Sequence, residues 1–592
     1  MRLADYIVQF LADRGILTPF VVTGRGALFL NDALAKHSDI APVFTHHEQG
    51  AAFAAVAGAD ATGAPQAVVV STGCASTNVI TGVLSAWQDH LPLVVISGQN
   101  TLKETTRHSG LALKTFGQQE ADIISIVEPI CKYAVMLDDP TRVRYELEKM
   151  FHLAQSGNAG PVWLDVPLDI QNARITPEEL VGFDAPQEDL HPSKAQMADL
   201  RAAFQAAQRP VILIGAGVRH ARVADMVRAF CEARAVPLVY TASSVDCVPL
   251  QEEISIGSLG SQGCSRAGAF TVQNADLVVV LGSRLNSLTT GPDFAKFARA
   301  AKIVVVDICK EEFDKDSVRI DSFIHANLAK VLPALLDSAA ELPTYQSWLS
   351  QAQHWKARFG QMSEFQSQNG EVDLHEFARE LHTLLPAEGV FVCDSGFVDV
   401  IVPTNAALSR GQRVVRPVSQ GAMGFALPGA LGVATCAHRP VLCMVGDGSI
   451  MMNIQELETI ARSGAPIKIV VVLNGMYAII KRRQTELFRG RTIGVDLETG
   501  LREPDFEQIT RAFGVRFIRA GVETYADHIR AEFAKPGPAL ITIPGKQKQD
   551  YIEVGLGRDA TNRLARRPLE DQKPFLDREV FRSEMLIPTI DE

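Results

Sequence analysis

Apolar runs alternate with amphipathic, helix-like segments along most of this chain. Several runs end at or just before Gly, Ser, Asp or Asn, including those at 67–71, 93–97, 211–214, 278–281, 304–306, 441–445 and 467–473. Buried strands of parallel sheets have continuous apolar sequences, and helices connect them across both faces. We therefore expect an α/β protein with doubly wound parallel sheets.

The strand-like runs form three blocks. At 592 residues the chain is too long for a single core, and about three domains of ordinary size fit this length. Two polar segments, 175–194 and 341–371, separate the blocks and are expected to be connectors. The expected organisation is three doubly wound domains and a C-terminal tail, at 1–175, 194–340, 372–545 and 546–592.

Composition and charge exclude several classes of protein. The chain is 47% hydrophobic and 21% charged, with a net charge of −11 and a pI near 5.8. These values are typical of globular proteins and predict no basic surface for nucleic acid or an anionic membrane. The nine cysteines are scattered, no apolar run has the length of a membrane span, and the first residues lack the apolar region of a signal peptide. We expect a cytoplasmic protein with reduced thiols.

The stretch 446–474 carries the clearest chemistry. Gly446-Asp447-Gly448-Ser449 follows one apolar run, and Asn474 follows the next, with a helix-like segment at 454–462 between them. One βαβ unit would place Asp447 and Asn474 at the carboxyl ends of neighbouring parallel strands. Open α/β sheets bind their ligands at that edge.

These residue types suit a cation and a diphosphate. A carboxylate and an amide oxygen on one side of Mg²⁺, with a diphosphate on the other, satisfy a hard cation. Gly446 and Gly448 let the backbone approach phosphate, and Ser449 opens a helix with free N–H groups. Short Gly-Asp turns are also common without any ligand. The sequel of helix, strand and Asn474 favours a Mg²⁺–diphosphate site.

The same stretch resembles the GDG…NN signature of thiamine diphosphate (ThDP) enzymes. The other half of that family's pattern is similar to Thr45-His46-His47-Glu48-Gln49-Gly50. The resemblance implies that Glu48 is the catalytic carboxyl group beside the aminopyrimidine ring of ThDP. A partly buried carboxyl group can share a proton with a ring nitrogen. The alternative is that Glu48 is a solvated acid at the start of a helix. For His47 the family pattern favours structural support over acid-base catalysis.

The resemblance covers nearly the whole chain and is closest to the acetohydroxyacid synthase group. Segments at 22–26, 71–78, 91–98, 118–120 and 419–425 match that group's motifs. It implies that Gln119 lies near the reacting centre. It also implies ThDP contacts from Gly24, Gly73, Asn78, Gly396, Gly421, Met423, Gly446, Gly448 and Ser449. The implied Mg²⁺ ligands are Asp447, Asn474 and the main-chain carbonyl of Met476.

The middle block raises the possibility of a flavin. Glycines stand at strand ends, where a backbone can approach a dinucleotide, and an Asp at a strand end can accept from ribose. In the acetohydroxyacid synthase group the corresponding places bind FAD, which implies contacts from Gly215, Gly217, Gly282, Arg284 and Asp307, with the segment 257–263. The alternative is a vestigial domain with an empty cleft. We expect FAD as a structural cofactor.

The resemblance implies a carboligase that removes CO₂ from a 2-oxo acid, pyruvate in the simplest case, and transfers a two-carbon unit to a carbonyl acceptor. Acetolactate synthase proper, a simple 2-oxo acid decarboxylase and a non-catalytic ThDP-fold subunit are the alternatives. In this family Glu48 and Asp447 would serve one ThDP across a subunit interface. A homodimer or homotetramer is therefore expected.

Some positions depart from the acetohydroxyacid synthase pattern. Leu473 replaces the first Asn of the NN pair, Cys74-Ala75 replaces Pro-Gly, and Arg25 replaces a Gly. The segment 477–484 lacks the acceptor-selecting Trp, and the cations that follow are Lys481, Arg482, Arg483, Arg489 and Arg491. These features resemble ThDP flavoenzymes that extend nucleotide-linked keto-sugars, as in yersiniose-type branched sugars. The cations would bind a diphosphate, or form a solvated basic face. The tail would fold over the cofactor cleft and exclude water.

Overall fold

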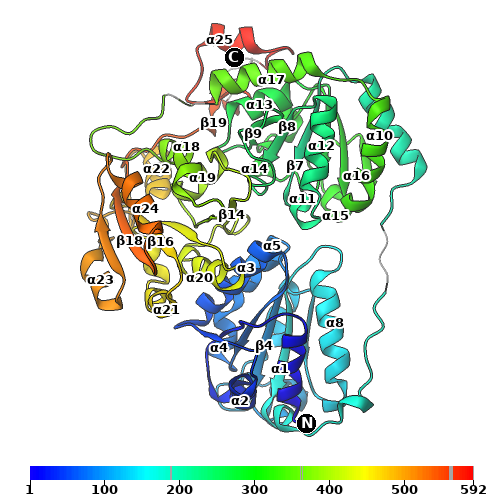
Figure 1. The fold of residues 1–592 in the computed structure, drawn as a ribbon, viewed down its shortest axis with the longest axis vertical. Helices are drawn as coiled ribbons and strands as arrows, with labels where there is room; N and C mark the ends of the chain where they lie inside the picture. The colour runs from blue at the N-terminus through cyan, green and yellow to red at the C-terminus, as the bar shows by residue number, and fades with distance from the viewer. Residues whose placement is uncertain (187–189, 361, 363, 559–563, 591–592) are drawn as a thin grey trace.

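The computed structural model describes residues 1–186, 190–360, 362, 364–558 and 564–590. Parts of the two predicted connectors (187–189, 361 and 363) and of the tail (559–563, 591 and 592) lie outside the described residues. Three six-stranded parallel sheets follow one another along the chain, each flanked by helices (Figure 1). The predicted fold class, three doubly wound α/β domains, is confirmed.

The first sheet has the strand order β2-β1-β3-β4-β6-β5. Its strands are β1 (Phe20–Val21), β2 (Val43–Phe44), β3 (Gln66–Val70), β4 (Leu93–Gln99), β5 (Tyr133–Met136) and β6 (Val162–Pro167). The main helices are α1 (Leu3–Asp13), α2 (Leu28–Lys36), α3 (Glu48–Thr62), α5 (Ile80–Gln88) and α8 (Val143–Gln155). All residues of β3, β4 and β6 are buried, which explains their continuous apolar sequences.

The central sheet has the order β12-β11-β10-β7-β8-β9. Its strands are β7 (Pro210–Ile214), β8 (Leu238–Thr241), β9 (Ser255–Leu259), β10 (Leu277–Leu281), β11 (Lys302–Asp307) and β12 (Ser322–His325). Its helices include α10 (Lys194–Ala206), α11 (Ala216–His220), α12 (Ala224–Arg234), α13 (Arg266–Gln273), α16 (Leu328–Asp337) and α17 (Gln346–Phe359). Helix α17 lies inside the predicted connector 341–371, yet Trp348 and Trp355 are buried in the central core. This part of the connector therefore belongs to the domain.

The third sheet has the order β14-β13-β15-β16-β18-β17. Its strands are β13 (Val390–Cys393), β14 (Arg413–Val415), β15 (Val441–Gly446), β16 (Ile467–Leu473), β17 (Arg516–Arg519) and β18 (Ala539–Pro544). Its helices include α18 (Leu374–Leu384), α19 (Phe397–Asn405), α20 (Ala426–Cys436), α21 (Glu456–Ser463), α22 (Ala478–Leu487), α23 (Phe506–Phe513) and α24 (Tyr525–Phe533). Strands β15 and β16 pair in parallel with α21 between them, so the predicted βαβ unit is confirmed.

Helix α3 joins the first and third domains. Its Ala- and Gly-rich sequence lets α20 approach closely, because a Cβ on Gly432 would lie 1.9 Å from the Ala54 main-chain oxygen. Phe53 packs edge-on against Phe425 with ring centroids 5.3 Å apart. The two domains of one chain therefore share a core, and α3 and α20 lie side by side in Figure 1.

The C-terminal tail packs on the central domain. Its elements are β19 (Glu553–Val554), β20 (Leu556–Arg558), β21 (Leu564–Arg566), β22 (Gln572–Lys573) and α25 (Arg578–Glu584). Helix α25 lies beside α17 in Figure 1, and Phe581 joins the central core. Glu584 accepts a hydrogen bond from Trp355 Nε1 at 2.8 Å. This part of the tail completes the central domain.

The nine cysteines are all free thiols. Five of them are buried, at Cys131, Cys231, Cys264, Cys393 and Cys443. In the described part of the chain, no helix combines the length and the apolar character that a membrane span requires.

Candidate functional site

Asp447 and Asn474 meet at the carboxyl ends of β15 and β16, as the βαβ unit predicts. Asp447 Oδ2 accepts hydrogen bonds from Asn474 N at 2.9 Å and Gly475 N at 2.7 Å. Asn474 Oδ1 accepts one from Met476 N at 3.2 Å, which identifies the oxygen of that amide. Burial raises the pKa of Asp447, and the N–H groups that surround it oppose that effect. The three predicted metal-ligand residues therefore lie together, with Asp447 bonded to the 474–476 turn.

The donor set of this turn fits Mg²⁺, which prefers oxygen ligands and keeps few protein carboxylates. Among the described residues no group of three or more His, Cys, Asp and Glu side chains could hold a metal, so this set depends on one carboxylate with amide and main-chain oxygens. A Cβ on Gly448 would lie 2.3 Å from Tyr477 Cε1, while one on Gly446 would meet nothing within 4 Å. The Gly446 side is therefore the open one. Leu473 lies at the end of β16 and contributes no ligand to the turn.

Asp394 is a site residue that the sequence reasoning missed. It follows β13, and its Oδ2 accepts from Gly424 N at 3.0 Å and from Ser449 Oγ at 2.9 Å. Its Oδ1 is buried with no hydrogen-bond partner in the structure. Burial raises the pKa of Asp394 to about 7. Asp394 thus connects the Met423 loop to the Gly-Asp-Gly-Ser turn. The sequence pattern that could have identified it is an acidic residue directly after a buried strand.

The other predicted residues of the third domain lie on loops beside this turn. Gly396 precedes α19 with φ +102°, and Gly421 has φ +61°. Met423 is half-buried next to Gly424, whose N–H is held by Asp394. These residues border the turn that carries Asp447.

Glu48 begins α3, and the structure joins it to Asn78. Glu48 Oε2 accepts a hydrogen bond from Asn78 Nδ2 at 2.9 Å, and both side chains are half-buried. His47 caps the helix, because its Nδ1 accepts from Gln49 N at 3.1 Å. The structural role favoured for His47 agrees with this geometry. The same helix start contacts the third domain through Asn453 Nδ2, which donates to Gln49 Oε1 at 3.1 Å.

Gly73 and Gln119 lie in direct backbone contact. Gly73 has φ +67°, and a Cβ there would lie 1.8 Å from the Gln119 main-chain oxygen, so only glycine fits. Gln119 itself has φ +58° and an exposed side chain. Gly24 packs on the same turn, since a Cβ on it would lie 2.5 Å from Ser71 Cβ. The predicted residues of the first domain therefore gather around the carboxyl ends of β1 and β3.

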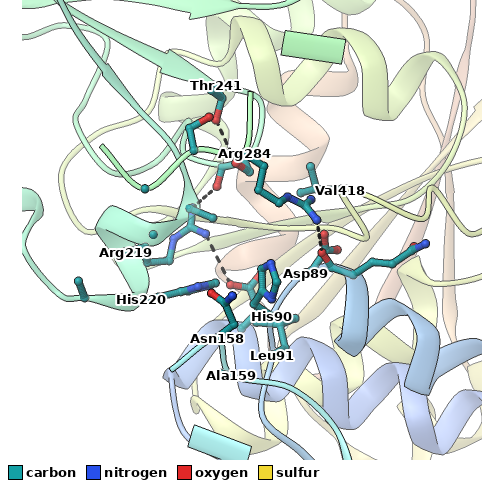
Figure 2. Close-up of a pocket in the computed structure, with 18 of the residues that line it drawn as sticks. Asp89, His90, Leu91, Asn158, Ala159, Arg219, His220, Thr241, Arg284 and Val418 are labelled. Carbon is teal, nitrogen blue, oxygen red and sulfur yellow. Dashed lines mark hydrogen bonds and ion pairs between the residues drawn. The ribbon is translucent and has the colours of Figure 1, made fainter. Parts of the chain in front are cut away.

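A cavity of about 730 Å³ opens where the three domains meet (Figure 2). Gly217, Gly282, Arg284 and Asp307 line it. Gly215 is not part of the lining but packs on Gly282, since a Cβ on it would lie 2.3 Å from the Gly282 main-chain oxygen. A Cβ on Gly217 would lie 2.7 Å from Gly282 Cα, so the two strand ends cross at backbone distance. The predicted flavin residues are thus brought together around an open space.

The charged groups of the cavity come from different domains. Arg284 donates to the Gln88 main-chain oxygen at 2.9 Å and to Ser419 Oγ at 2.6 Å. Burial, helped by Arg284, lowers the pKa of His90 to about 4, and burial raises that of Asp89 to about 6. The His90 ring is therefore neutral at physiological pH, while the cavity keeps a cationic wall at Arg284.

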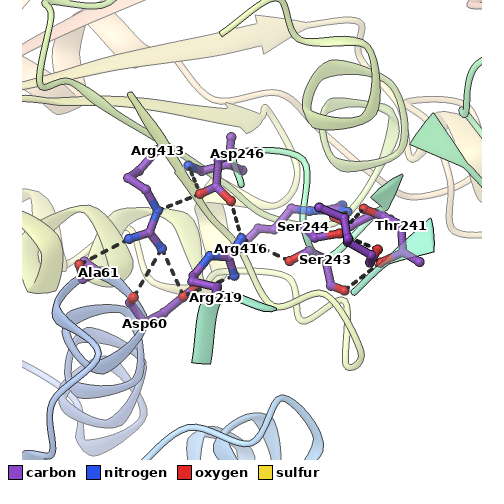
Figure 3. A network of polar contacts seen from close by, with 12 residues as sticks. Asp60, Ala61, Arg219, Thr241, Ser243, Ser244, Asp246, Arg413 and Arg416 are labelled. Carbon is purple, nitrogen blue, oxygen red and sulfur yellow. Dashed lines mark hydrogen bonds and ion pairs between the residues drawn. The ribbon is translucent and has the colours of Figure 1, made fainter. Parts of the chain in front are cut away.

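A buried ion-pair network ties the domains together at the cavity rim (Figure 3). Asp246 of the central domain pairs with Arg219 and with Arg413 Nε, the latter at 2.6 Å. Asp60, at the end of α3, lies 3.4 Å from Arg413 and 3.8 Å from Arg219. Burial alone would raise the pKa of Asp246, but the two guanidinium groups outweigh it and hold the pKa well below its usual range. The network joins all three domains.

The basic segment on α22 is largely ion-paired. Lys481 Nζ lies 2.7 Å from Asp496 Oδ2. Arg482 and Arg483 pair with the two oxygens of Glu553 at 2.6 and 2.8 Å. Glu553, the partner of Arg482 and Arg483, lies in the tail, far away in sequence. The charge pattern of the basic segment therefore could not reveal it and indicated either a ligand or solvent. Arg482 and Arg483 hold the tail against the third domain, whereas Lys481 pairs within that domain.

Comparison with known families agrees with this geometry. Models described as the N-terminal TPP binding domain, the central domain and the C-terminal TPP binding domain of thiamine pyrophosphate enzymes match residues 1–126, 197–335 and 394–543. The three matches follow the order of the three sheets, and the C-terminal one contains Asp447 and Asn474.

Curated relatives extend the match over most of the chain. The acetolactate synthase large subunit of Corynebacterium glutamicum is 32% identical over 595 residues, which covers 96% of this chain and 91% of the relative. The acetolactate synthase isozyme 3 large subunit of Escherichia coli is 29% identical over 523 residues, covering 86% and 88%. Acetolactate synthase 3, chloroplastic, of Brassica napus is 27% identical over 557 residues, covering 91% and 83%. The chain therefore belongs to the thiamine pyrophosphate enzyme family, as a ThDP-dependent, acetolactate synthase-like enzyme of the carboligase type.

Proposed function

We propose that this enzyme requires ThDP and Mg²⁺, removes CO₂ from pyruvate or a closely related 2-oxo acid, and transfers the two-carbon unit to a carbonyl acceptor. The turn that joins Asp447 and Asn474 carries this proposal, because its oxygen donors suit a cation bound to diphosphate. The Glu48–Asn78 hydrogen bond supports it with a positioned carboxyl group. The relatives' names support carboligation over simple decarboxylation.

Each predicted residue has a defined task in this scheme. Asp447, Asn474 Oδ1 and the Met476 carbonyl would hold Mg²⁺, and Gly446 would admit the diphosphate. Bound ThDP supplies the electron sink that the loss of CO₂ requires. Glu48 would hold a proton at the aminopyrimidine ring, with its carboxyl group oriented by the Asn78 amide. Gln119 would contact the reacting carbonyl groups from its exposed position beside Gly73.

The cavity between the three domains is the proposed site of FAD. Its volume of about 730 Å³ and the close backbone approach of Gly217 and Gly282 support a large dinucleotide. Asp307 lies at the end of β11, where its carboxyl group can accept from ribose hydroxyls. Carboligation involves no net redox change, so the flavin would be structural and stay oxidised during turnover.

A second copy of this chain is the proposed cover of the ThDP segments. Large apolar side chains are exposed on the stretches that carry the predicted site residues, at Leu111, Leu113, Phe116, Met451, Met452, Ile480, Leu487 and Phe488. Exposed apolar side chains in such numbers are characteristic of protein interfaces. A homodimer or homotetramer would bury them and shield the reaction from water.

The acceptor is proposed to be a ketone larger than a second pyruvate. The absence of Trp in the segment 477–484 supports a wider acceptor site. Lys481, Arg482 and Arg483 are engaged by carboxylates, so the cations available to an anionic acceptor on this segment are the exposed Arg489 and Arg491. Acetolactate synthase proper is the competing function, favoured by the names of the relatives.

Product analysis separates these functions. The purified enzyme is incubated with pyruvate, ThDP, Mg²⁺ and FAD, with and without bulky ketones that carry or lack a diphosphate. CO₂ release with a new ligation product only when a bulky ketone is present supports the proposal. Efficient acetolactate formation with larger ketones ignored makes the enzyme an acetolactate synthase. Acetaldehyde as the sole product makes it a decarboxylase.

A further inference from the structure

A buried hydrogen-bond network lies beneath the loop that carries Gln119. Its centre is Gln99, the last residue of β4, which is only 2% exposed. A buried amide left without partners costs about 1–3 kcal/mol for each unsatisfied group. The hydrogen bonds made by the Gln99 side chain therefore offset the cost of burying it.

The orientation of the Gln99 amide follows from its neighbours. Its Oε1 accepts from Asn100 N at 2.9 Å and from Thr72 Oγ1 at 2.6 Å. Because a main-chain N–H can only donate, the oxygen must face Asn100 and the Nε2 group must face the other way. Nε2 donates to the Ala121 main-chain oxygen and to Asp165 Oδ2, both at 3.1 Å.

Asp165 holds the amide from inside the sheet. It lies on β6 and is buried, and its Oδ1 accepts from Ser97 Oγ at 2.6 Å. Ser97 Oγ in turn accepts from the buried Trp163 Nε1 at 2.8 Å. These hydrogen bonds run in one direction, from Trp163 to Ser97 to Asp165, so the Gln99 amide has to present its Nε2 group to Asp165.

The network contacts both sides of Gln119. On the N-terminal side, Asn100 Nδ2 donates to the Gln118 main-chain oxygen at 3.0 Å. On the C-terminal side, Gln99 Nε2 donates to the Ala121 main-chain oxygen. Thr72, the other partner of Gln99, precedes Gly73, against which the Gln119 backbone packs. Gln119 has φ +58°, a conformation that a non-glycine residue keeps only when its surroundings impose it.

We infer that Gln99, oriented by Asp165, is a positioning residue for Gln119. It touches neither substrate nor cofactor; it fixes the 118–121 loop against the Thr72–Gly73 turn, so that the Gln119 side chain points at the reacting centre. This inference rests on the role of Gln119 in the proposed function. Removal of the Gln99 amide should therefore slow turnover through Gln119 alone.

The test compares Gln99→Met with Gln119→Ala and with the double variant. Met keeps the length of the side chain and removes all hydrogen bonds of the Gln99 amide. We expect kcat to fall roughly 10–100-fold with little change in KM or in ThDP affinity, since a misplacement of about 1 Å costs that much. In the Gln119→Ala background Gln99→Met should cause no further loss. Gln66→Met, at a buried Gln of the neighbouring strand β3, is the matched control.

Hydrogen–deuterium exchange of residues 115–122 provides a readout that does not depend on turnover. Exchange there should accelerate in Gln99→Met and not in Gln66→Met. If Gln99→Met does not fold, Gln99→Glu keeps the acceptor for Thr72 and Asn100 but presents an oxygen to Ala121, and should accelerate the same exchange. Unchanged exchange, or losses in kcat that multiply in the double variant, would overturn the inference. A wild-type enzyme without CO₂ release would overturn the proposed function instead, while the exchange result still decides whether Gln99 holds the loop.

Discussion

The two predicted cofactor regions are built in opposite ways. The central cavity is formed by three domains of one chain, and the network of Asp60, Arg219, Asp246 and Arg413 ties its rim. The ThDP segments are open by contrast. Gln119 is exposed, and a Cβ on Gly446 would meet nothing within 4 Å.

This difference has a structural meaning. A region tied by buried ion pairs is complete once a single chain has folded. A region of exposed turns beside exposed apolar side chains needs another surface to exclude water. Substitutions in the cavity should therefore act within a chain, whereas defects at the ThDP segments should be shareable between subunits.

The largest expected effect is at Glu48. Glu48→Gln should keep the fold and ThDP binding but lower turnover by about 10²–10⁴-fold, because the neutral amide cannot exchange a proton with the cofactor ring. The measurement is CO₂ release from pyruvate with ThDP and Mg²⁺. Glu232→Gln, at an exposed carboxylate of α12, is the control. Wild-type turnover in Glu48→Gln would refute the assigned role.

Mixed subunits test the comparison directly. If Glu48 and Asp447 of different chains serve one ThDP, equal amounts of Glu48→Gln and Asp447→Ala protein should recover activity in roughly a quarter of the sites after random pairing. Mixing that restores nothing, although the subunits exchange, would place both residues of each site in one chain.

Asp447→Ala is expected to weaken ThDP binding in the presence of Mg²⁺ on the order of tenfold or more, since the diphosphate is held through the cation. Titration of ThDP at fixed Mg²⁺ measures the dissociation constant. Asp527→Ala, at an exposed acid of α24, should leave it unchanged. Equal affinities of the wild type and Asp447→Ala would exclude Asp447 as a ligand.

Gly217→Ala tests the cavity. The added Cβ would lie 2.7 Å from Gly282 Cα, so the strand ends must separate and the flavin-binding surface must change. The purified variant should carry less FAD than the wild type by visible absorbance, with ThDP affinity retained. Gly521→Ala, whose Cβ would be 3.9 Å from its nearest neighbour, is the matched control. An undiminished flavin content would remove Gly217 from the flavin site.

The smallest expected effect concerns pH and Asp165. Burial raises the pKa of Asp165 to about 7, whereas an unfolded Asp titrates near pH 4. Between these values the folded state binds a proton that the unfolded chain has released, so the contribution of Asp165 to the free energy of unfolding is full below pH 4 and is lost as the pH rises to about 7. As the pH rises from 4 to 7, the wild type should lose stability relative to Asp165→Asn, which does not titrate there; denaturant unfolding of both proteins at several pH values measures this. A pH-independent difference would contradict the raised pKa.

Local pattern was sufficient for the fold class and for the meeting of Asp447 with Asn474 at one sheet edge. Apolar runs identify buried parallel strands, and a right-handed crossover places consecutive strand ends at one edge, so Asp447 and Asn474 had to meet. The same reasoning could not find Asp394, because its partners Gly424 and Ser449 come from other loops. It also assigned α17 to a connector, because the many polar residues of this segment outweigh Trp348 and Trp355 in the pattern, although both rings are buried.

The sequence by itself therefore determined the order of elements, the three-domain class and the short-range residue pairs, because these depend on periodicity and on chain geometry. Only the tertiary structure decided which distant groups meet. Glu553 of the tail pairs with Arg482 and Arg483, Asp246 binds arginines of two domains, and Asp165 orients Gln99. Such pairs form because packing brings distant segments together and a buried polar group needs a partner there. The spacing of residues along the sequence does not reveal which distant partner that is.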